Sequence, residues 1–298
     1  MVNEEINKRF RGHDTLKAKI PPRFHPNLER DYLRTVDAYT ELTKQTLKKY
    51  MPVIKEAIKE REKANEGYRA DADKKPLYMV INDTLEAMKA DLTRRLKKFK
   101  LAEKLKKLAN LMFGVVTQDW HDLVLATLGI DIYDDYYKGE FYQRIVPQWI
   151  DLNVGLIETI PQEELDIMKE QILNTFYVGG TNKTLATEIE KVYHTGKYRA
   201  RFLARDQMAK LNGRINKEQQ QDAGVTEYIW RTVGDERVRE SHKKLNGRKF
   251  SWSNPPIVDD KTQRRCAPME DYQCRCVPIP VFNKNVTLPV AGRKELNG

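Results

Sequence analysis

Cysteine is scarce in this sequence, which holds only 3 of them among 298 residues. All three lie late in the chain, at Cys266, Cys274 and Cys276. Secreted domains that depend on disulfides carry an even number of cysteines spread through the fold. The sequence therefore does not fit a secreted disulfide framework, and the cysteines are predicted to be free thiols or metal ligands.

Long apolar runs are also missing. A helix that crosses a membrane needs roughly 20 consecutive apolar residues, and no run in the chain approaches that length. The polar start MVNEEINKRFRGHD lacks the apolar core of a signal peptide. We therefore expect no membrane partner, and we expect the protein to stay in the cytoplasm unless a larger assembly carries it out.

Acidic residues are outnumbered by basic ones, with 43 Asp and Glu against 53 Lys and Arg, for a net charge of +10. A basic protein attracts polyanions, which makes nucleic acid a candidate partner. The alternative is that the lysines only solvate helix faces. Hydrophobic residues make up 40% of the chain and charged residues 32%, and the many Lys, Glu, Leu and Ala favour helix.

We predict a mostly α-helical fold with an elongated helical N-terminal region and a small α+β domain at the C-terminus. Prolines 21, 22 and 26 break up the polar start, and Gly179-Gly180 is the best candidate for a domain boundary. The predicted segments are a flexible arm over 1–26, a helical domain over 27–179, an α+β domain over 180–282 and a loose tail over 283–298.

The strongest helical pattern begins at Leu77, where apolar residues through Phe99 fall on one stripe. A second stripe from Leu101 lies on the opposite side, so the helix either breaks near 99–101 or contacts different neighbours at its two ends. Thr159-Ile-Pro-Gln162 resembles a capping box and predicts the start of a further helix.

After Gly224 the residue types change from helix-favouring to strand-favouring. The β-branched and aromatic run Val225–Thr232 predicts a strand. Cys276–Phe282 predicts an edge strand, because each of its two prolines removes a hydrogen-bond donor from the ladder.

One segment is strongly basic. Between Arg94 and Lys107 there are eight basic residues and one acidic residue, Glu103. Such a segment could lie along phosphates, or its side chains could extend into water around a core helix. The candidate contacts are Arg94, Arg95, Lys97, Lys98, Lys100, Lys104, Lys106 and Lys107.

The most informative motifs follow one another between 199 and 282. In order they are Ala204-Arg-Asp-Gln207, Trp230, Asp235-Glu-Arg-Val-Arg239 with His242, Leu245-Asn-Gly247 and Cys274-Arg-Cys276. This succession resembles the Mu F-like phage head morphogenesis family. That family's pattern runs from a helix with an Ala-Arg-Thr-Glu-like element, through a Trp strand and Asp-x-Arg-x-x-x-x-His, to a Leu-x-Gly turn and Cys-Arg-Cys. The chain departs from it at Asp206-Gln207, which removes an acidic contact there.

The resemblance covers the last third of the chain and implies a minor head protein of a tailed bacteriophage. It implies a few copies bound to the portal protein inside the capsid, facing double-stranded DNA and assisting head assembly and DNA packaging or ejection. The major capsid or scaffolding protein is a further candidate partner. The implied location is the virion near the portal, with the host cytoplasm during assembly, and the implied role is not enzymatic.

Four residues form a candidate metal site: His242, Cys266, Cys274 and Cys276. One imidazole and three thiols are a ligand set of structural zinc. Residues i and i+2 of a strand point to the same side, so Cys274 and Cys276 could share an ion if the strand bends. Against zinc, the spacing is not that of paired Cys-x-x-Cys knuckles, and ordinary buried thiols are the alternative.

Asp235 and His242 also permit a catalytic hypothesis, a zinc-dependent nuclease or a toxin-like transferase in which Asp235 orients a histidine base. The resemblance instead implies that these residues scaffold the small domain. Arg237 and Arg239 are candidates for phosphate or portal contact, or for pairing with local carboxylates. No phosphate-binding glycine loop or nucleophile elbow is present.

Overall fold

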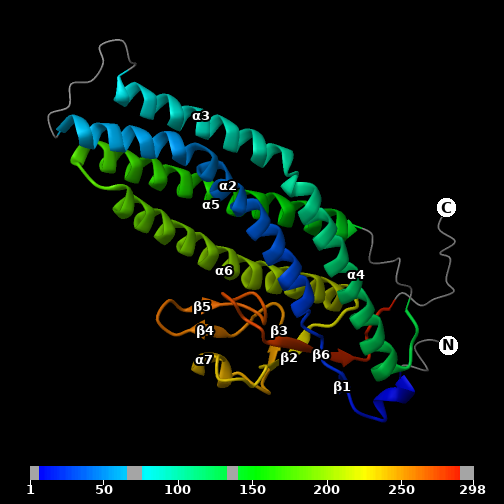
Figure 1. Ribbon diagram of the computed structural model, residues 1–298. Coiled ribbons are helices and arrows are strands. Elements are labelled where there is room, and N and C mark those ends of the chain that lie inside the picture. The colour runs from blue at the N-terminus through cyan, green and yellow to red at the C-terminus, as the bar shows by residue number, and fades with distance from the viewer. Residues whose placement is uncertain (1–6, 66–75, 133–139, 289–298) are drawn as a thin grey trace. The chain divides into compact units, whose positions relative to one another are not determined.

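The computed structural model describes residues 7–65, 76–132 and 140–288 (Figure 1). Five long helices are α2 (Pro26–Asn65), α3 (Leu77–Lys98), α4 (Leu101–Leu128), α5 (Glu140–Val178) and α6 (Asn182–Asp222), and α7 (Glu240–Lys243) is a single turn. The strands are β1 (Thr15–Lys17), β2 (Glu227–Arg231), β3 (Lys249–Ser251), β4 (Ile257–Asp259), β5 (Arg264–Arg265) and β6 (Val277–Asn283). The predicted fold class, long helices followed by a small C-terminal sheet, is confirmed. No helix in the described ranges combines the length and apolar character needed to span a bilayer.

The predicted break after the first stripe is real. The backbone N–H of Phe99 donates to the carbonyl of Leu96, which closes α3, and Lys100 adopts a positive φ of 56° before α4 begins. Because a left-handed residue cannot continue an α-helix, the two stripes belong to separate helices.

The helix start predicted at Thr159 is wrong, because α5 runs unbroken from Glu140 to Val178. The Thr159 hydroxyl donates to the carbonyl of Leu156, 2.8 Å away, within the helix. Ile157 and Ile160 are fully buried. Burial of these side chains outweighs the backbone hydrogen bond that Pro161 removes, so packing overrides a local capping signal.

The chain forms two compact units, each assembled from separate stretches. Unit 1 comprises Met1–Arg30, Lys106–Ile150 and Arg205–Gly298, and unit 2 comprises Asp31–Leu105 and Asp151–Ala204. Gly179, with a φ of +99°, follows the last residue of α5 as predicted, but the connection lies inside unit 2. The predicted segments are contiguous in sequence, whereas the compact units are not.

Unit 2 has an apolar interior made by helices. Aliphatic side chains from four helices bury one another there, as the amphipathic patterns of the helices require. The cluster includes Ile54, Ile58, Ile81, Leu85, Met168, Ile172 and Leu185.

Unit 1 holds a four-stranded antiparallel sheet in the order β1-β6-β2-β3, with β4 and β5 as a separate hairpin (Figure 1). The strand predicted over 225–232 is confirmed as β2. The prediction that the last strand lies at an edge is wrong, because β6 lies between β1 and β2.

The two prolines of β6 explain how it occupies an inner position. The carbonyl of Pro280 accepts from the backbone N–H of Ala18, and the carbonyl of Pro278 accepts from the side chain of Gln220. N–H and C=O of one strand residue point to the same side. The missing proline donors therefore face away from β2, and the β2–β6 ladder loses nothing.

Part of the stretch predicted as a flexible arm over 1–26 is paired with the sheet. β1 pairs with β6, matching Thr15 to Asn283, and Phe10 and Ala18 are buried. Val286, in the predicted loose tail, is buried as well. The β1 ladder therefore joins residues 15–17 to the sheet, and the predicted tail beyond 288 lies outside the described residues.

Buried amides on α6 connect the parts of unit 1. The Asn212 amide donates to the carbonyl of Arg23, and the Gln219 amide donates to the hydroxyl of Thr117. The Gln220 amide donates to the carbonyl of Pro278 on β6. Together these hydrogen bonds join α6 to the N-terminal stretch, α4 and the sheet. Since buried polar groups need partners, they fix the position of α6 beside the candidate site.

Candidate metal centre

Three predicted ligands converge in unit 1. His242 lies on α7, and Cys274 and Cys276 lie in the turn just before β6. Their ligand atoms all lie within 4.8 Å of one another, and all three residues are buried. Nδ1 of His242 is 3.7 Å from Sγ of Cys274 and 3.6 Å from Sγ of Cys276.

A tight turn places the two thiols. The backbone N–H of Cys274 donates to the carbonyl of Asp271, and that of Cys276 donates to Sγ of Cys274 at 3.4 Å. Gln273 adopts a positive φ of 50° inside the turn. The bend that the sequence required for Cys274 and Cys276 to face one ion is therefore present, but before the strand begins.

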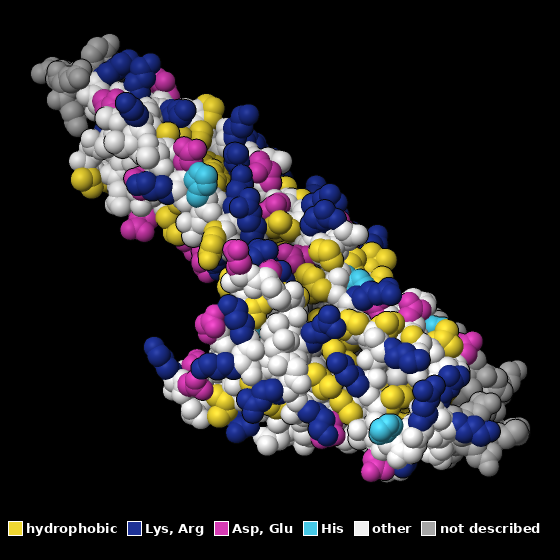
Figure 2. Space-filling model, turned by 90° about the horizontal axis from the view of Figure 1, so that it is seen from below, with side chains coloured by type: hydrophobic (Ala, Val, Ile, Leu, Met, Phe, Trp, Pro, Cys, Tyr) yellow, Lys and Arg dark blue, Asp and Glu magenta, His cyan; other side chains and the backbone are white. Residues whose placement is uncertain are grey.

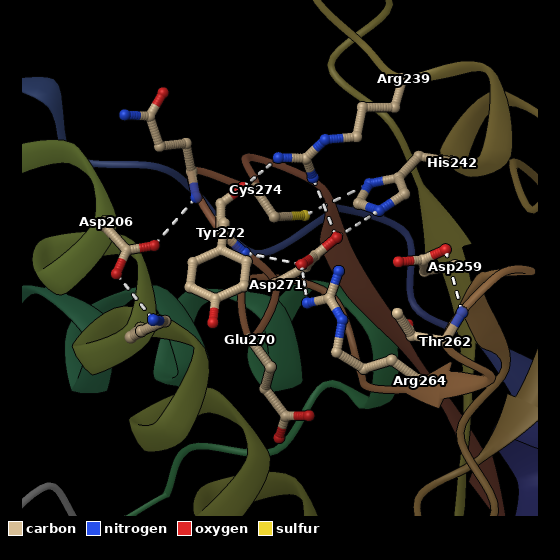
Figure 3. Close-up of polar contacts among 12 residues, drawn as sticks. Asp206, Arg239, His242, Asp259, Thr262, Arg264, Glu270, Asp271, Tyr272 and Cys274 are labelled. Atoms are coloured by element: carbon tan, nitrogen blue, oxygen red, sulfur yellow. Dashed lines mark hydrogen bonds and ion pairs between the residues drawn. The ribbon is translucent and has the colours of Figure 1, made fainter. Parts of the chain in front are cut away.

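Asp271 orients the histidine ring (Figure 3). Its Oδ2 lies 3.0 Å from Nε2 of His242, and its side chain is only 1% exposed. A carboxylate that accepts from one ring nitrogen leaves the other with its lone pair free for a metal. Nδ1 of His242, which faces the two thiols, is therefore the ligand atom that this arrangement selects.

Asp271 is itself held by several donors (Figure 3). Arg239 donates to its Oδ2 at 2.9 Å, and Arg264 donates to its Oδ1. The backbone N–H of Tyr272 donates to the same Oδ1 at 2.8 Å. Sequence reasoning did not single out Asp271, since nothing local distinguishes it from the other acidic residues of the chain.

The charges of the centre are strongly coupled. Burial disfavours a charged His242, but its hydrogen bonds to Asp271 and Cys274 prevail and raise its pKa to about 9. Burial would raise the pKa of Asp271, and its bonds to His242 and Arg264 instead hold it well below its usual range. Contact with Cys276 and then His242 lowers the pKa of Cys274 against burial. Metal binding requires a thiolate and a neutral imidazole, so an ion that binds here displaces the proton of His242.

The motifs around this centre agree with a comparison with known families. Residues 166–279 match the family model described as Phage Mu protein F like protein. The C-terminal part of this chain belongs to the Phage Mu protein F-like family. That membership suggests a head morphogenesis protein of a bacteriophage and implies a virion location.

A curated relative adds to the comparison. An uncharacterised protein of Haemophilus influenzae (strain ATCC 51907 / DSM 11121 / KW20 / Rd) is 35% identical over 147 residues, which cover 48% of this chain and 32% of that protein. The chain thus spans about a third of the length of this curated relative. No solved structure matches the chain.

The Mu F-like segment, residues 166–279, contains every residue of the centre. Its departure from the family pattern at Asp206 does not cost an acidic contact. Oδ1 of Asp206 accepts from the backbone N–H of Gln273 at 2.9 Å, and Oδ2 accepts from Lys210 at 2.6 Å (Figure 3). Asp206 on α6 therefore supports the turn that carries Cys274.

Cys266 lies apart from the three ligands. It is buried in the apolar cluster of the Mu F-like segment with Tyr228, Trp252 and Val258. Burial, and then the nearby Asp271, raise the pKa of its thiol to about 12. Its sulfur is not among the ligand atoms that converge, so the structure brings together three of the four predicted ligands.

Asp235 does not orient His242. Its Oδ2 accepts from Arg275 at 2.5 Å and lies 3.8 Å from Arg237. Arg239 bonds to Asp271 and to the carbonyl of Tyr272. Among the residues that the structure describes, the predicted Asp235–His242 pair is replaced by Asp271–His242, and the two arginines pair with local carboxylates.

The basic segment outside the Mu F-like segment divides into engaged and exposed side chains. Arg94 and Arg95 both pair with Asp91, Lys100 pairs with Glu103, and Lys104 lies over the ring of Phe99. The side chains of Lys97, Lys98, Lys106 and Lys107 are exposed. Figure 2 shows Lys and Arg side chains spread over the face drawn, among acidic ones, and not gathered into a single patch.

The residues of the centre suit a metal ion. Two sulfur ligands and one imidazole nitrogen form a soft set that zinc prefers. The site is buried, its histidine is oriented by a carboxylate, and its ligand atoms already converge. The group could hold a metal, with His242, Cys274 and Cys276 supplying the protein ligands.

Proposed function

We propose that this protein is a minor head protein of a tailed bacteriophage that binds the portal protein inside the capsid. It assists head assembly and DNA packaging or ejection, and it is not an enzyme. The observation that carries this proposal is the family match over residues 166–279, which encloses the whole candidate metal centre.

The centre is proposed to be structural and to hold zinc. A bound ion would link α7 to the turn before β6, two short elements with little apolar contact area of their own. Both ring nitrogens of His242 are engaged, Nε2 by Asp271 and Nδ1 by the thiols. This supports a structural role over that of a histidine base, because a general base needs a free ring nitrogen.

Contact with double-stranded DNA is proposed through the exposed lysines of the basic segment. Lys97 and Lys98 are exposed at the end of α3, and Lys106 and Lys107 are exposed on α4. Side chains of this kind bind phosphates without reading sequence. The affinity for duplex DNA should fall steeply as the salt concentration rises. When Lys97 and Lys98 are replaced by Gln, the slope of affinity against salt concentration should become smaller.

Portal binding is tested by co-expression with the portal protein of the phage that encodes this chain. The two proteins should elute together from a sizing column, and a portal protein from an unrelated phage serves as the control. Independent elution of the cognate pair would count against the proposal.

The metal is tested by elemental mass spectrometry of the purified chain. One zinc per chain is expected, with loss in Cys274→Ser and His242→Ala and retention in Cys266→Ser, the matched control. A chain purified without metal under zinc-replete conditions, or equal loss in all three variants, would contradict the structural zinc site.

The enzymatic alternative, a zinc-dependent nuclease or toxin-like transferase, has a direct readout. The chain is incubated with DNA and divalent metals, and no cleavage is expected. Cleavage that disappears in His242→Ala and persists in the exposed control Arg231→Gln would replace the structural proposal with a nuclease.

A further inference from the structure

Four arginines surround one small pocket beside the metal centre. The pocket has a volume of about 130 Å³, and Arg205, Arg237, Arg239 and Arg275 line it together with the residues of the centre. Arg205 comes from α6, Arg237 and Arg239 precede α7, and Arg275 lies between the two ligand cysteines. Arginines from three separate segments therefore line one cavity.

The nearby carboxylates do not accept from all the N–H donors of these arginines. Arg275 bonds to Asp235 at 2.5 Å, but Arg237 lies 3.8 Å from the same carboxylate. The Arg205 guanidinium lies 3.5 Å from Glu29, beyond a good hydrogen bond. Each guanidinium carries five N–H donors, so Arg205 and Arg237 keep donors for another acceptor.

The remaining arginine shares its carboxylate. Arg239 bonds to Asp271, which also serves Arg264 and His242. The arginines around the pocket thus outnumber the carboxylates that neutralise them. The side chain of Arg237 is 66% exposed and that of Arg239 is 46% exposed, so an anion can reach them from solvent.

We propose that this pocket binds a phosphate group. Guanidinium forks pair with oxyanions through parallel N–H bonds, and several forks from different directions suit the tetrahedral oxygens of phosphate better than a planar carboxylate. The small volume admits one such group. The source is either free inorganic phosphate or a backbone phosphate of nucleic acid, which present the same oxygens to the pocket. The proposal depends on the arginines and does not require the metal.

The test titrates the full chain with inorganic phosphate at constant ionic strength in a calorimeter. Binding is expected, and the double variant Arg205→Gln/Arg237→Gln should weaken it at least about tenfold, because charge-assisted hydrogen bonds are lost. These two arginines are chosen because they make the loosest ion pairs of the four. Arg231→Gln removes an exposed arginine of the same unit that does not line the pocket and should change nothing.

A circular dichroism melt establishes that the double variant is folded, and Arg237→Gln alone replaces it if it is not. Competition by a short DNA duplex would identify backbone phosphate as the ligand, and its failure to compete would identify the free ion, each in support of the pocket. Absence of phosphate binding, equal binding by the pocket variant, or binding of acetate as tight as that of phosphate would overturn the proposal.

Discussion

The two compact units are stabilised in different ways. In unit 2, aliphatic side chains of long helices bury one another, and the charged residues lie mainly at the surface. In unit 1, strands of two to seven residues surround a core that mixes aromatic rings with thiols, beside buried ion pairs. Long amphipathic helices bury enough apolar area by themselves, whereas short strands depend on polar connections between loops.

The two units differ most clearly in how they surround a buried carboxylate. Asp271 in unit 1 and Asp91 in unit 2 each face three cations, and their side chains are 1% and 4% exposed. The cations around Asp91 are Lys49, Arg94 and Arg95, which reach solvent. One partner of Asp271, His242, is itself buried and cannot be rehydrated without opening the fold.

The largest effect is therefore expected for Asp271→Asn. It should lower the free energy of unfolding by about 3–5 kcal/mol, the cost of leaving the buried charge of His242 unpaired. Asp91→Asn should cost only about 1 kcal/mol, because water can solvate its partners. Urea unfolding followed by helical circular dichroism measures both losses. All four tryptophans lie in unit 1, so their fluorescence reports the Asp271→Asn loss in that unit alone. Equal losses would show that the two units do not differ in this way.

The next effect concerns a buried acid in unit 2. Burial raises the pKa of Glu164 from 4.5 to about 7, and its Oε2 has no hydrogen-bond partner among the described residues. The folded state then holds a proton that the unfolded chain has released, so stability falls as pH rises from about 4.5 to about 7 and levels off above.

Glu164→Gln should remove this slope and stabilise the protein at pH 8 by roughly 2–3 kcal/mol. The measurement is the urea midpoint at pH 5 and at pH 8. Glu163→Gln, an exposed neighbour paired with Arg199, is the matched control and should leave the slope in place. A wild-type stability that does not change between these two pH values would refute the prediction.

A smaller loss is expected from Gly213→Ala in unit 1. A Cβ at Gly213 would lie 2.6 Å from Cβ of Met269, on the loop that leads to Asp271. Overpacking of this kind costs about 1–3 kcal/mol, and it should also weaken zinc retention because the loop must shift. Thermal melts and metal content measure the two consequences, and a variant unchanged in both would contradict the contact.

The smallest effect has the opposite sign and lies in unit 2. A Cβ at Gly155, an exposed position of α5, would meet nothing within 4 Å. Gly155→Ala should stabilise the helix by about 0.5–1 kcal/mol, because alanine loses less backbone entropy than glycine. A calorimetric melt checks it, and any destabilisation would be unexpected for an open helix position.

Much of the helical architecture could be predicted because its signals are local. The change of apolar stripe near Lys100 marks a real helix break, and Gly179 ends α5. The wrong predictions concern segments whose structure is determined by contacts with residues far away in the sequence. Thr159 carries a capping motif but lies inside a helix held by buried isoleucines, and the prolines of β6 face away from β2, which no sequence pattern reveals.

The candidate site divides in the same manner. His242, Cys274 and Cys276 could be selected because few residue types bind zinc, and their convergence agrees with that selection. Asp271 could not be selected, since its role comes from a turn that brings it within hydrogen-bond distance of Nε2 of His242. Cys266 shares the chemistry of the ligands, but its sulfur is not among the converging ligand atoms, and side-chain direction is invisible in the sequence.

The pairing of Thr15 with Asn283 has a consequence for how the chain folds during synthesis. A ribosome has to synthesise the chain as far as Asn283 before β1 can pair with β6, and such long-range pairing is slow. Until then the outer side of β6 is open to strands of other molecules. Pro278 and Pro280 have no N–H donors on that side. The exposed edge of β6 therefore pairs poorly with strands of other molecules before β1 is added.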